Sequence, residues 1–313
     1  MRLALVALLL VACGHGDPAP VRTAAPGVAA LTWKRIADIP TPRSEVAAAV
    51  LGGVIYIVGG FGGGNVVETF AADRWTVAAR YPIAVDHAMA AAVDVAGTPG
   101  LYVFGGNVNG VAVARSFRFF GDQGWREIAS MPAPRSQGAA VAIGGKIFIV
   151  GGAGNDRLVS PTYMYDTATD RWSSAAAIPT PRDHLAAVAF AGRVCAIGGR
   201  RLSLLQNLAT FECYDPGRDT WQTMPDAPTA RGGIGAAVVG DRIFVAGGEE
   251  AIGTFKEVDI FDAVAGTWTR GPDLPTSRHG LGFVAVGTTL YAMSGGPTPG
   301  VSQTAVCEAL DVR

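Results

Sequence analysis

Residues 54–60 read Val-Ile-Tyr-Ile-Val-Gly-Gly, an apolar, β-branched run closed by a pair of glycines. Similar runs end at Gly59-Gly60, Gly105-Gly106, Gly151-Gly152, Gly198-Gly199, Gly247-Gly248 and, in a sixth copy, Ser294-Gly295-Gly296. Three residues before each of these points stand Tyr56, Tyr102, Phe148, Cys195, Phe244 and Tyr291. Tyr56 and Tyr291 are five intervals and 235 residues apart, so the mean period is 47 residues.

Two further markers keep the same period. One is a tryptophan in each unit: Trp33, Trp75, Trp125, Trp172, Trp221 and Trp268. The other is an arginine after Pro, Ser or Ala, at Arg43, Arg135, Arg182, Arg231 and Arg278, with Val85 in the second slot. Three markers that share one period and a count of six indicate an internal repeat.

Each unit predicts four strands. The first is small and apolar, as in residues 47–50, which suits the narrow axis where several sheets converge. The second is the bulky run before the glycines, the third ends in an aromatic followed by Asp, and the fourth carries the tryptophan. Four short strands in a repeat of this length are typical of a β-propeller blade, so the fold predicted is all-β and six-bladed.

These residues resemble the kelch repeat, in which an apolar strand, Gly-Gly, Tyr-Asp, a Trp seven residues on and Pro-x-Pro-Arg follow in order. Tyr165 and Trp172 keep the seven-residue offset, as do Tyr214 and Trp221. The resemblance covers about residues 31–313 and implies four antiparallel strands per blade. Units one and two depart from it by shorter turns before Trp75 and Trp125.

Both ends of the predicted propeller indicate how the ring closes. Residues 31–36, Leu-Thr-Trp-Lys-Arg-Ile, read as an outer strand with no blade before it. The chain stops at Arg313, just after a third strand over 304–310. We therefore expect the first segment to complete the sixth blade and remove an open sheet edge.

Composition excludes several classes of protein. Lys plus Arg is 25 and Asp plus Glu is 26, so a basic excess for nucleic-acid binding is missing. Apolar residues make up 49% and charged ones 16%, which argues against disorder. Gly is 42 of 313, as a chain of short strands and tight turns requires.

The first thirty residues predict a targeting segment. Arg2 and the apolar run 3–10 predict a signal peptide over 1–12, because the run is too short to span a bilayer. Leu10-Val11-Ala12-Cys13 resembles the bacterial lipobox, which implies cleavage before Cys13 and its acylation; an ordinary signal peptide with a stray cysteine is the alternative. The residue directly after Cys13 is Gly14. Asp at this position would favour retention in the inner membrane, so we expect an outer-membrane lipoprotein of the cell envelope.

Residues 13–30, rich in Pro, Ala and Gly, are expected to be the lipidated tether. We expect a monomer that touches the membrane only through its lipid.

The kelch resemblance places the loops from the fourth strand of one blade to the first of the next (d–a loops) on one face, around the channel mouth. The loops between second and third strands (b–c loops) lie on the same face. Candidate ligand-binding residues there are Arg43, Asp86, His87, Arg135, Arg182, Asp183, His184, Arg231, Arg278 and His279. The d–a loops also carry Glu45 and Gln137, and the b–c loops can add Asn65, Asn107, Asn155, Arg200, Arg201, Glu249 and Glu250.

Two interpretations of the five arginines remain open. Aimed at the axis, they would form a positive funnel for a carboxylate, an acidic peptide or an acidic sugar. Alternatively, each hydrogen-bonds neighbouring carbonyls and locks the blades together.

Three of the four histidines, His87, His184 and His279, fall in these loops, where they could serve acid–base chemistry or metal binding. They come from different blades and show no local ligand spacing, so we assign no metal, no cofactor and no catalytic residue. Copper-radical oxidases also use kelch propellers, but this chain lacks their longer, seven-bladed setting and cross-linked cysteine.

Cys195 and Cys213 lie on adjacent predicted strands, and export would permit a disulfide between them. Their register cannot be read from the sequence. If they pair, Cys307 stays free.

The predicted function is non-catalytic binding of a protein partner or an anionic or sugar ligand through the loop face. No P-loop, nucleophile elbow or zinc-protease helix occurs. The alternative is an enzyme resembling the exported six-bladed sialic-acid epimerases. In that case Asp86, His87, Asp183, His184 or Glu249 would transfer the proton.

Overall fold

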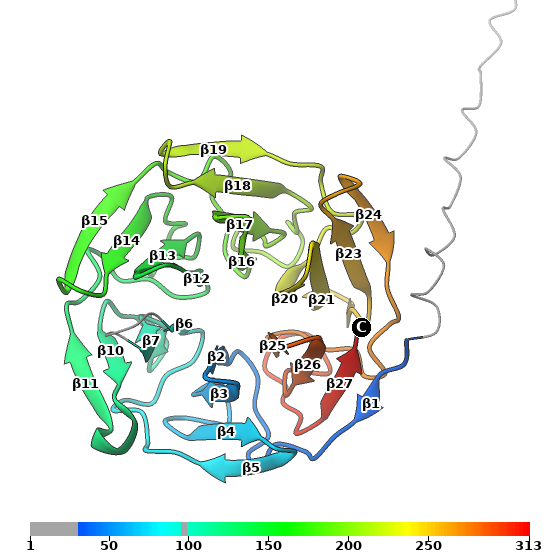
Figure 1. Cartoon of the computed structure of the whole chain (residues 1–313), viewed down its shortest axis with the longest axis horizontal. Helices are drawn as coiled ribbons and strands as arrows, with labels where there is room; N and C mark the ends of the chain where they lie inside the picture. The colour runs from blue at the N-terminus through cyan, green and yellow to red at the C-terminus, as the bar shows by residue number, and fades with distance from the viewer. Residues whose placement is uncertain (1–30, 95–98) are drawn as a thin grey trace, which may run out of the picture.

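The computed structural model describes residues 31–94 and 99–313, which form six antiparallel sheets around a common axis (Figure 1). The predicted six-bladed all-β propeller is confirmed. The predicted signal peptide, Cys13 and the tether lie outside the described residues. Within these residues, no helix is long and apolar enough to cross a membrane.

Blades one to three follow the chain in order from the innermost to the outermost strand. Blade one is β2 (Ala47–Leu51), β3 (Val54–Val58), β4 (Val67–Ala71) and β5 (Arg74–Val77). Blade two is β6 (Met89–Val93), β7 (Gly100–Phe104), β10 (Ser116–Phe119) and β11 (Trp125–Ile128). Blade two also has a hairpin of β8 (Asn107–Val108) and β9 (Val111–Ala112), and a 3-10 turn η2 (Gly121–Gln123). Blade three is β12 (Ala139–Ile143), β13 (Lys146–Val150), β14 (Thr162–Asp166) and β15 (Arg171–Ala175).

Blades four to six complete the ring. Blade four is β16 (Ala186–Phe190), β17 (Arg193–Ile197), β18 (Phe211–Asp215) and β19 (Thr220–Thr223). Blade five is β20 (Gly232–Val239), β21 (Arg242–Glu250), β23 (Val258–Asp262) and β24 (Thr267–Arg270), with β22 (Gly253–Thr254) paired to the end of β21. Blade six is β25 (Gly282–Val286), β26 (Thr289–Met293), β27 (Cys307–Asp311) and, from the start of the chain, β1 (Lys34–Arg35).

The hydrophobic core lies in the seams between neighbouring blades. In one seam Met89 and Phe104 of blade two pack with Ile147 and Tyr165 of blade three. Because every blade buries both faces in this way, none of the six sheets has a core of its own.

The tryptophans also join neighbouring blades through hydrogen bonds. Each indole N–H donates to a backbone carbonyl contributed by the preceding blade or the segment that leaves it, as Trp172 does to Ala129 at 2.8 Å and Trp221 to Ala176 at 2.9 Å. The repeating tryptophan therefore links each blade to the one before it as well as filling space.

The first segment closes the ring as expected. Lys34 lies opposite Ala309 and Arg35 opposite Glu308, and the blue strand β1 lies beside the red strand β27 (Figure 1). Trp33 is buried, and its indole N–H donates to the carbonyl of Pro272 at 2.9 Å. Residues from the two ends of the chain thus share one sheet.

Cys195 and Cys213 form a disulfide, because β17 and β18 place them directly opposite each other. Cys307 is buried and free. The structure resolves the register that the sequence left open.

We predict that a chain beginning at residue 39 melts at a lower temperature than one beginning at residue 31, or aggregates. The deletion exposes the edge of β27 and removes Trp33, and losing a buried tryptophan costs about 3–5 kcal/mol. Calorimetry of the two chains checks this, and identical melting curves would contradict closure by β1.

Candidate binding site at the channel mouth

A closed ring of backbone hydrogen bonds surrounds the channel at one end. In each step a backbone N–H of one blade donates to a carbonyl of the preceding blade. The donors are His87 to Glu45 at 3.0 Å, Gln137 to His87 at 3.1 Å, His184 to Gln137 at 2.7 Å, Gly233 to His184 at 2.8 Å, Gly280 to Gly233 at 2.8 Å and Val46 to Gly280 at 3.4 Å. We call the residues Glu45, His87, Gln137, His184, Gly233 and Gly280 the axial ring.

All six residues of the axial ring have a left-handed backbone, with φ between 52° and 69°. Blades five and six place glycine there, which adopts this conformation without strain. A Cβ on Gly280 would come within 2.5 Å of the Glu45 carboxyl carbon, so glycine also makes room for that side chain. The other four residues are polar and hold a conformation that non-glycine residues rarely adopt, a feature that is concentrated at functional sites.

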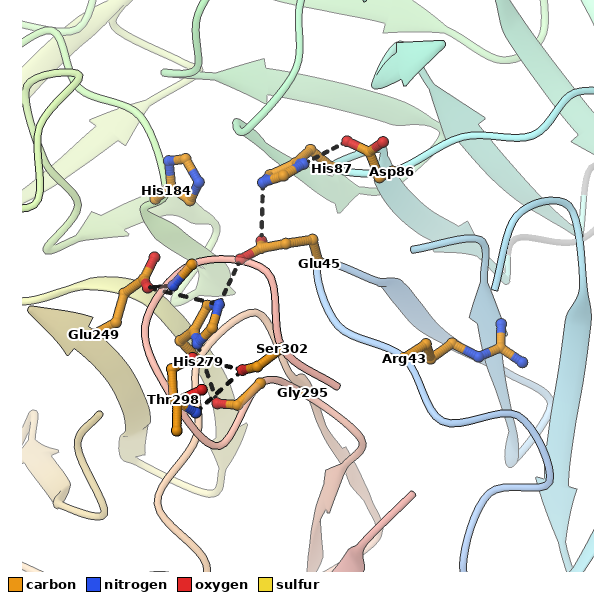
Figure 2. A network of polar contacts seen from close by, with 12 residues as sticks. Arg43, Glu45, Asp86, His87, His184, Glu249, His279, Gly295, Thr298 and Ser302 are labelled. Atoms are coloured by element: carbon orange, nitrogen blue, oxygen red, sulfur yellow. Dashed lines mark hydrogen bonds and ion pairs between the residues drawn. The ribbon is translucent and has the colours of Figure 1, made fainter. Parts of the chain in front are cut away.

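Three polar side chains of the ring, those of Glu45, His87 and His184, meet Glu249 from β21 and His279 from the loop before β25. We call these five residues the axial cluster. His87 Nε2 lies 3.3 Å from one carboxylate oxygen of Glu45, and His279 Nε2 lies 3.3 Å from the other (Figure 2). Glu249 lies 3.6 Å from His279 Nε2, and the His87 and His184 ring centroids are 5.1 Å apart. Glu45 is therefore shared by two histidines.

Each histidine is oriented through its other ring nitrogen. His87 Nδ1 lies 2.6 Å from Asp86, His184 Nδ1 lies 2.6 Å from Asp183, and His279 Nδ1 lies 3.1 Å from the carbonyl of Gly296. Carboxylate and carbonyl oxygens accept, so Nδ1 carries the proton in all three rings. The Nε2 atom of each ring therefore remains available for contacts near the channel axis.

Burial and charge pull the pKa values of this cluster in different directions. Burial opposes ionisation of Glu45, but His87, His184 and His279 outweigh it and lower the pKa of Glu45. Burial also disfavours the charged form of His87, yet Glu45 and Asp86 prevail and raise the pKa of His87. For His184 burial prevails and lowers the pKa, despite the hydrogen bond to Asp183. The histidines therefore differ in how readily they take up a proton.

Among the cavities at this end of the described structure, two adjoin the axial cluster. One, of about 90 Å³, is lined by residues of all six blades, including Glu45, His87 and His184. The other, of about 300 Å³, lies over blades two to four and is lined mainly by polar groups, among them Asn107, Gln137, Asp183 and Arg200. Both belong to the face made by the d–a and b–c loops, which we call the mouth face.

The prediction that Arg43, Arg135, Arg182, Arg231 and Arg278 line the mouth is wrong. All five are buried, at 0–1% exposure, and Figure 2 places Arg43 outside the axial cluster. Their guanidinium groups donate to carbonyls within the blade, as Arg182 does to Ala196 at 3.0 Å. The alternative interpretation, that the arginines lock the structure, is the one the geometry supports, although each acts within its own blade.

Four of these arginines pair with buried carboxylates on the third strand of the same blade. The pairs are Arg43–Glu68, Arg182–Glu212, Arg231–Asp259 and Arg278–Glu308. Blade three has Tyr163 at the corresponding place, and the Arg135 guanidinium lies over its ring at 4.4 Å. Burial there lowers the pKa of Arg135 to about 10. A buried charge needs a partner, and the carboxylates supply it.

The sequence-based candidates therefore divide into two groups. Asp86, His87, Asp183, His184 and His279 come together at the mouth, whereas the five arginines do not. Glu45 and Glu249 were assigned to the loops but not to the ligand-binding candidates, and Glu249 was named only as a possible proton-transfer residue. Glu45 nevertheless holds the same position in its unit as His87 and His184. The acidic partners of the arginines were missed. The available signal was an acidic residue at the second position of the third strand in four of the six blades.

Sheet count, closure and a polar channel mouth define a class of protein: a six-bladed β-propeller that presents its loops on one face. A family model for the KLHDC2/KLHL20/DRC7 kelch-repeats domain matches residues 66–226, and the kelch motif model matches residues 42–70 and 230–275. The chain belongs to the kelch-repeat family.

Several known proteins are similar to this chain. Kelch repeat and BTB domain-containing protein 1 of camelpox virus is 28% identical over 148 residues, which is 44% of this chain and 25% of the viral protein. Mouse Kelch-like protein 35 is 30% identical over 146 residues, 44% of this chain and 24% of its own length. The matches thus span about a quarter of each of these relatives.

A solved structure, that of YjhT, shares the fold with a TM-score of 0.74 at 19% sequence identity. The match covers 87% of this chain and 95% of that one.

We predict that Arg182→Ala lowers the free energy of unfolding by about 3–5 kcal/mol, because it leaves the buried Glu212 carboxylate without its cation. Denaturant unfolding measures this change. The exposed Arg201 is the control, and Arg201→Ala should stay within about 0.5 kcal/mol of the unsubstituted chain. Equal stability of the two variants would show that Arg182 does not lock its blade.

Proposed function

We propose that this protein is an exported, lipid-anchored kelch propeller that binds a partner protein through its mouth face, without catalysis. The observation that carries the proposal is the distribution of exposed apolar side chains. Seven large ones are exposed in the described part of the chain, and five of them lie in b–c loops: Val111, Leu202, Leu205, Ile252 and Val301. They come from blades two, four, five and six.

Exposed apolar side chains on loops that a rigid scaffold holds are typical of protein interfaces. Leu205 and Ile252 are more than four-fifths exposed, so burying them against a partner is favourable. An interface of this kind combines apolar contacts with a polar centre, which here is the axial cluster.

The charge of that centre favours one kind of partner surface. Glu45, Asp86, Asp183 and Glu249 surround the mouth, and Arg200 is already paired with Glu249 at 2.7 Å. With neutral histidines the centre is negative. We therefore favour a partner that presents a basic or hydroxyl-bearing segment to the mouth.

The hypothesis that the mouth binds an anionic ligand or an acidic sugar loses its main support, because it required the five arginines to line the mouth. The Asp86–His87 and Asp183–His184 pairs remain as groups able to move protons. Without a cationic clamp for a carboxylate, protein binding is the better supported function.

The test places a photo-crosslinking residue at position 205 or 252 in the exporting cell. We expect a discrete adduct with one partner, identified by mass spectrometry. The matched controls are positions 77 and 264, which are also exposed and apolar but lie on β5 and in the turn between β23 and β24. The same adducts from all four positions, or none from 205 and 252, would exclude the mouth face.

The lipid anchor is proposed from the sequence around Cys13. We expect Cys13→Ser to move the protein from the membrane fraction to the soluble fraction and to abolish incorporation of a labelled fatty acid. Cell fractionation and labelling measure both effects. A variant that stays with the membrane and keeps the label would rule out acylation at Cys13.

A further inference from the structure

We propose that the axial cluster is a binding site for one divalent transition-metal ion of the zinc type, with Glu45, His87 and His184 as ligands. One ligand atom from each of these three residues lies within 4.8 Å of the others. Glu45 also belongs to a second such group with Glu249 and His279. The proposal stands apart from partner binding and does not depend on it.

The first argument is that hydrogen-bond acceptors face one another across the axis. Because Nδ1 of His87 and of His279 is occupied by an acceptor, each ring in its neutral form would turn the lone pair of Nε2 toward a carboxylate oxygen of Glu45, 3.3 Å away. His279 Nε2 is buried and has no hydrogen-bond partner. Lone pairs at such distances need a cation between them, either protons on the rings or a metal ion.

The second argument concerns the groups behind the ligands. A metal-binding histidine usually donates its other N–H to a carboxylate or carbonyl, which fixes the ring. His87 and His184 do so to Asp86 and Asp183. These carboxylates are themselves held, Asp86 by Asn107 Nδ2 at 3.1 Å and Asp183 by the Leu202 N–H at 2.8 Å.

The third argument is charge. Four carboxylates, those of Glu45, Asp86, Asp183 and Glu249, and one cation, Arg200, lie in or directly behind the cluster. With neutral histidines this leaves three net negative charges in a largely buried volume. Burying unpaired charge is costly, and a divalent ion removes two of those charges at once.

The ligand types select the metal and its position. Two imidazoles and a carboxylate suit Zn²⁺ and its neighbours rather than Mg²⁺ or Ca²⁺, which prefer oxygen ligands. Glu249 is bound to Arg200 at 2.7 Å and accepts the Gly300 N–H at 2.8 Å, so the His279 side is the weaker one. We therefore expect one ion, with its fourth position open to the 90 Å³ cavity.

The backbone prepares the site before any ion arrives. His87 and His184 hold the left-handed conformation within the axial ring, so their direction toward the axis is set by the blades. Preorganised ligands lose little entropy when they bind.

The experiment measures Zn²⁺ binding to a chain that begins at residue 31 and carries no histidine tag. This chain retains only the three cluster histidines, because the fourth is His15. Titration calorimetry and elemental analysis should give one Zn²⁺ per chain, and X-ray absorption should report two imidazole ligands.

The variants are matched through the repeat. His87→Gly and His184→Gly copy the residue of blades five and six, and each should weaken Zn²⁺ binding at least tenfold. Gln137→Gly makes the same change at a ring position outside the ligand set and should leave the affinity unchanged. Asp183→Asn, behind His184, should weaken binding about 10- to 100-fold while the ligands stay in place.

Near-UV circular dichroism of each variant verifies folding. If His184→Gly fails to fold, Glu45→Gln keeps the side-chain shape while removing a charged ligand and gives the same test. Failure of the unsubstituted chain to bind Zn²⁺, equal affinity in His184→Gly and Gln137→Gly, or absorption spectra without imidazole would overturn the proposal. None of these outcomes bears on the crosslinks at positions 205 and 252.

Discussion

The close approach of successive blades near the axis is the constraint on which this structure depends. The second glycine of the pair in blades one to five donates its N–H to a carbonyl of the next blade, as Gly152 does to Arg182 at 2.8 Å. A Cβ on Gly151 would lie 2.7 Å from that same oxygen. In blade six Ser294 replaces the first glycine and its hydroxyl donates to the Arg43 carbonyl at 2.6 Å. These contacts, with the axial ring beside them, hold six separate sheets in one closed circle.

The same constraint creates the site. Blades that meet this closely force a left-handed backbone at the residue that enters the channel, and a side chain placed there projects toward the axis. Blades five and six have glycine at this position. In blades one to four the residues are Glu45, His87, Gln137 and His184, for which the left-handed conformation costs conformational free energy. The mouth is polar because these four positions are not glycine, not because loops are generally polar.

Electrostatics divides the molecule into two parts. The repeated arginines neutralise carboxylates inside the blades, where a buried ion pair contributes geometry and is costly to break. Because those arginines are paired inside the blades, the carboxylates around the histidines of the mouth outnumber the cations there. A chain with a formal charge of −1 therefore carries a local acidic centre that its total charge does not reveal.

Sequence by itself determined the repeat, the six blades, the role of Trp33 in closure and the loops that meet at the mouth, because each blade needs the same local residues at the same period. It did not determine the direction of the arginines, which depends on carboxylates such as Glu212 some thirty residues away. Nor did it determine the pairing of Cys195 with Cys213, which needs strand register. The axial cluster draws single residues from five blades, so it leaves no local spacing to recognise. Only ring closure brings Glu45, near the start of the described chain, against His279, near its end.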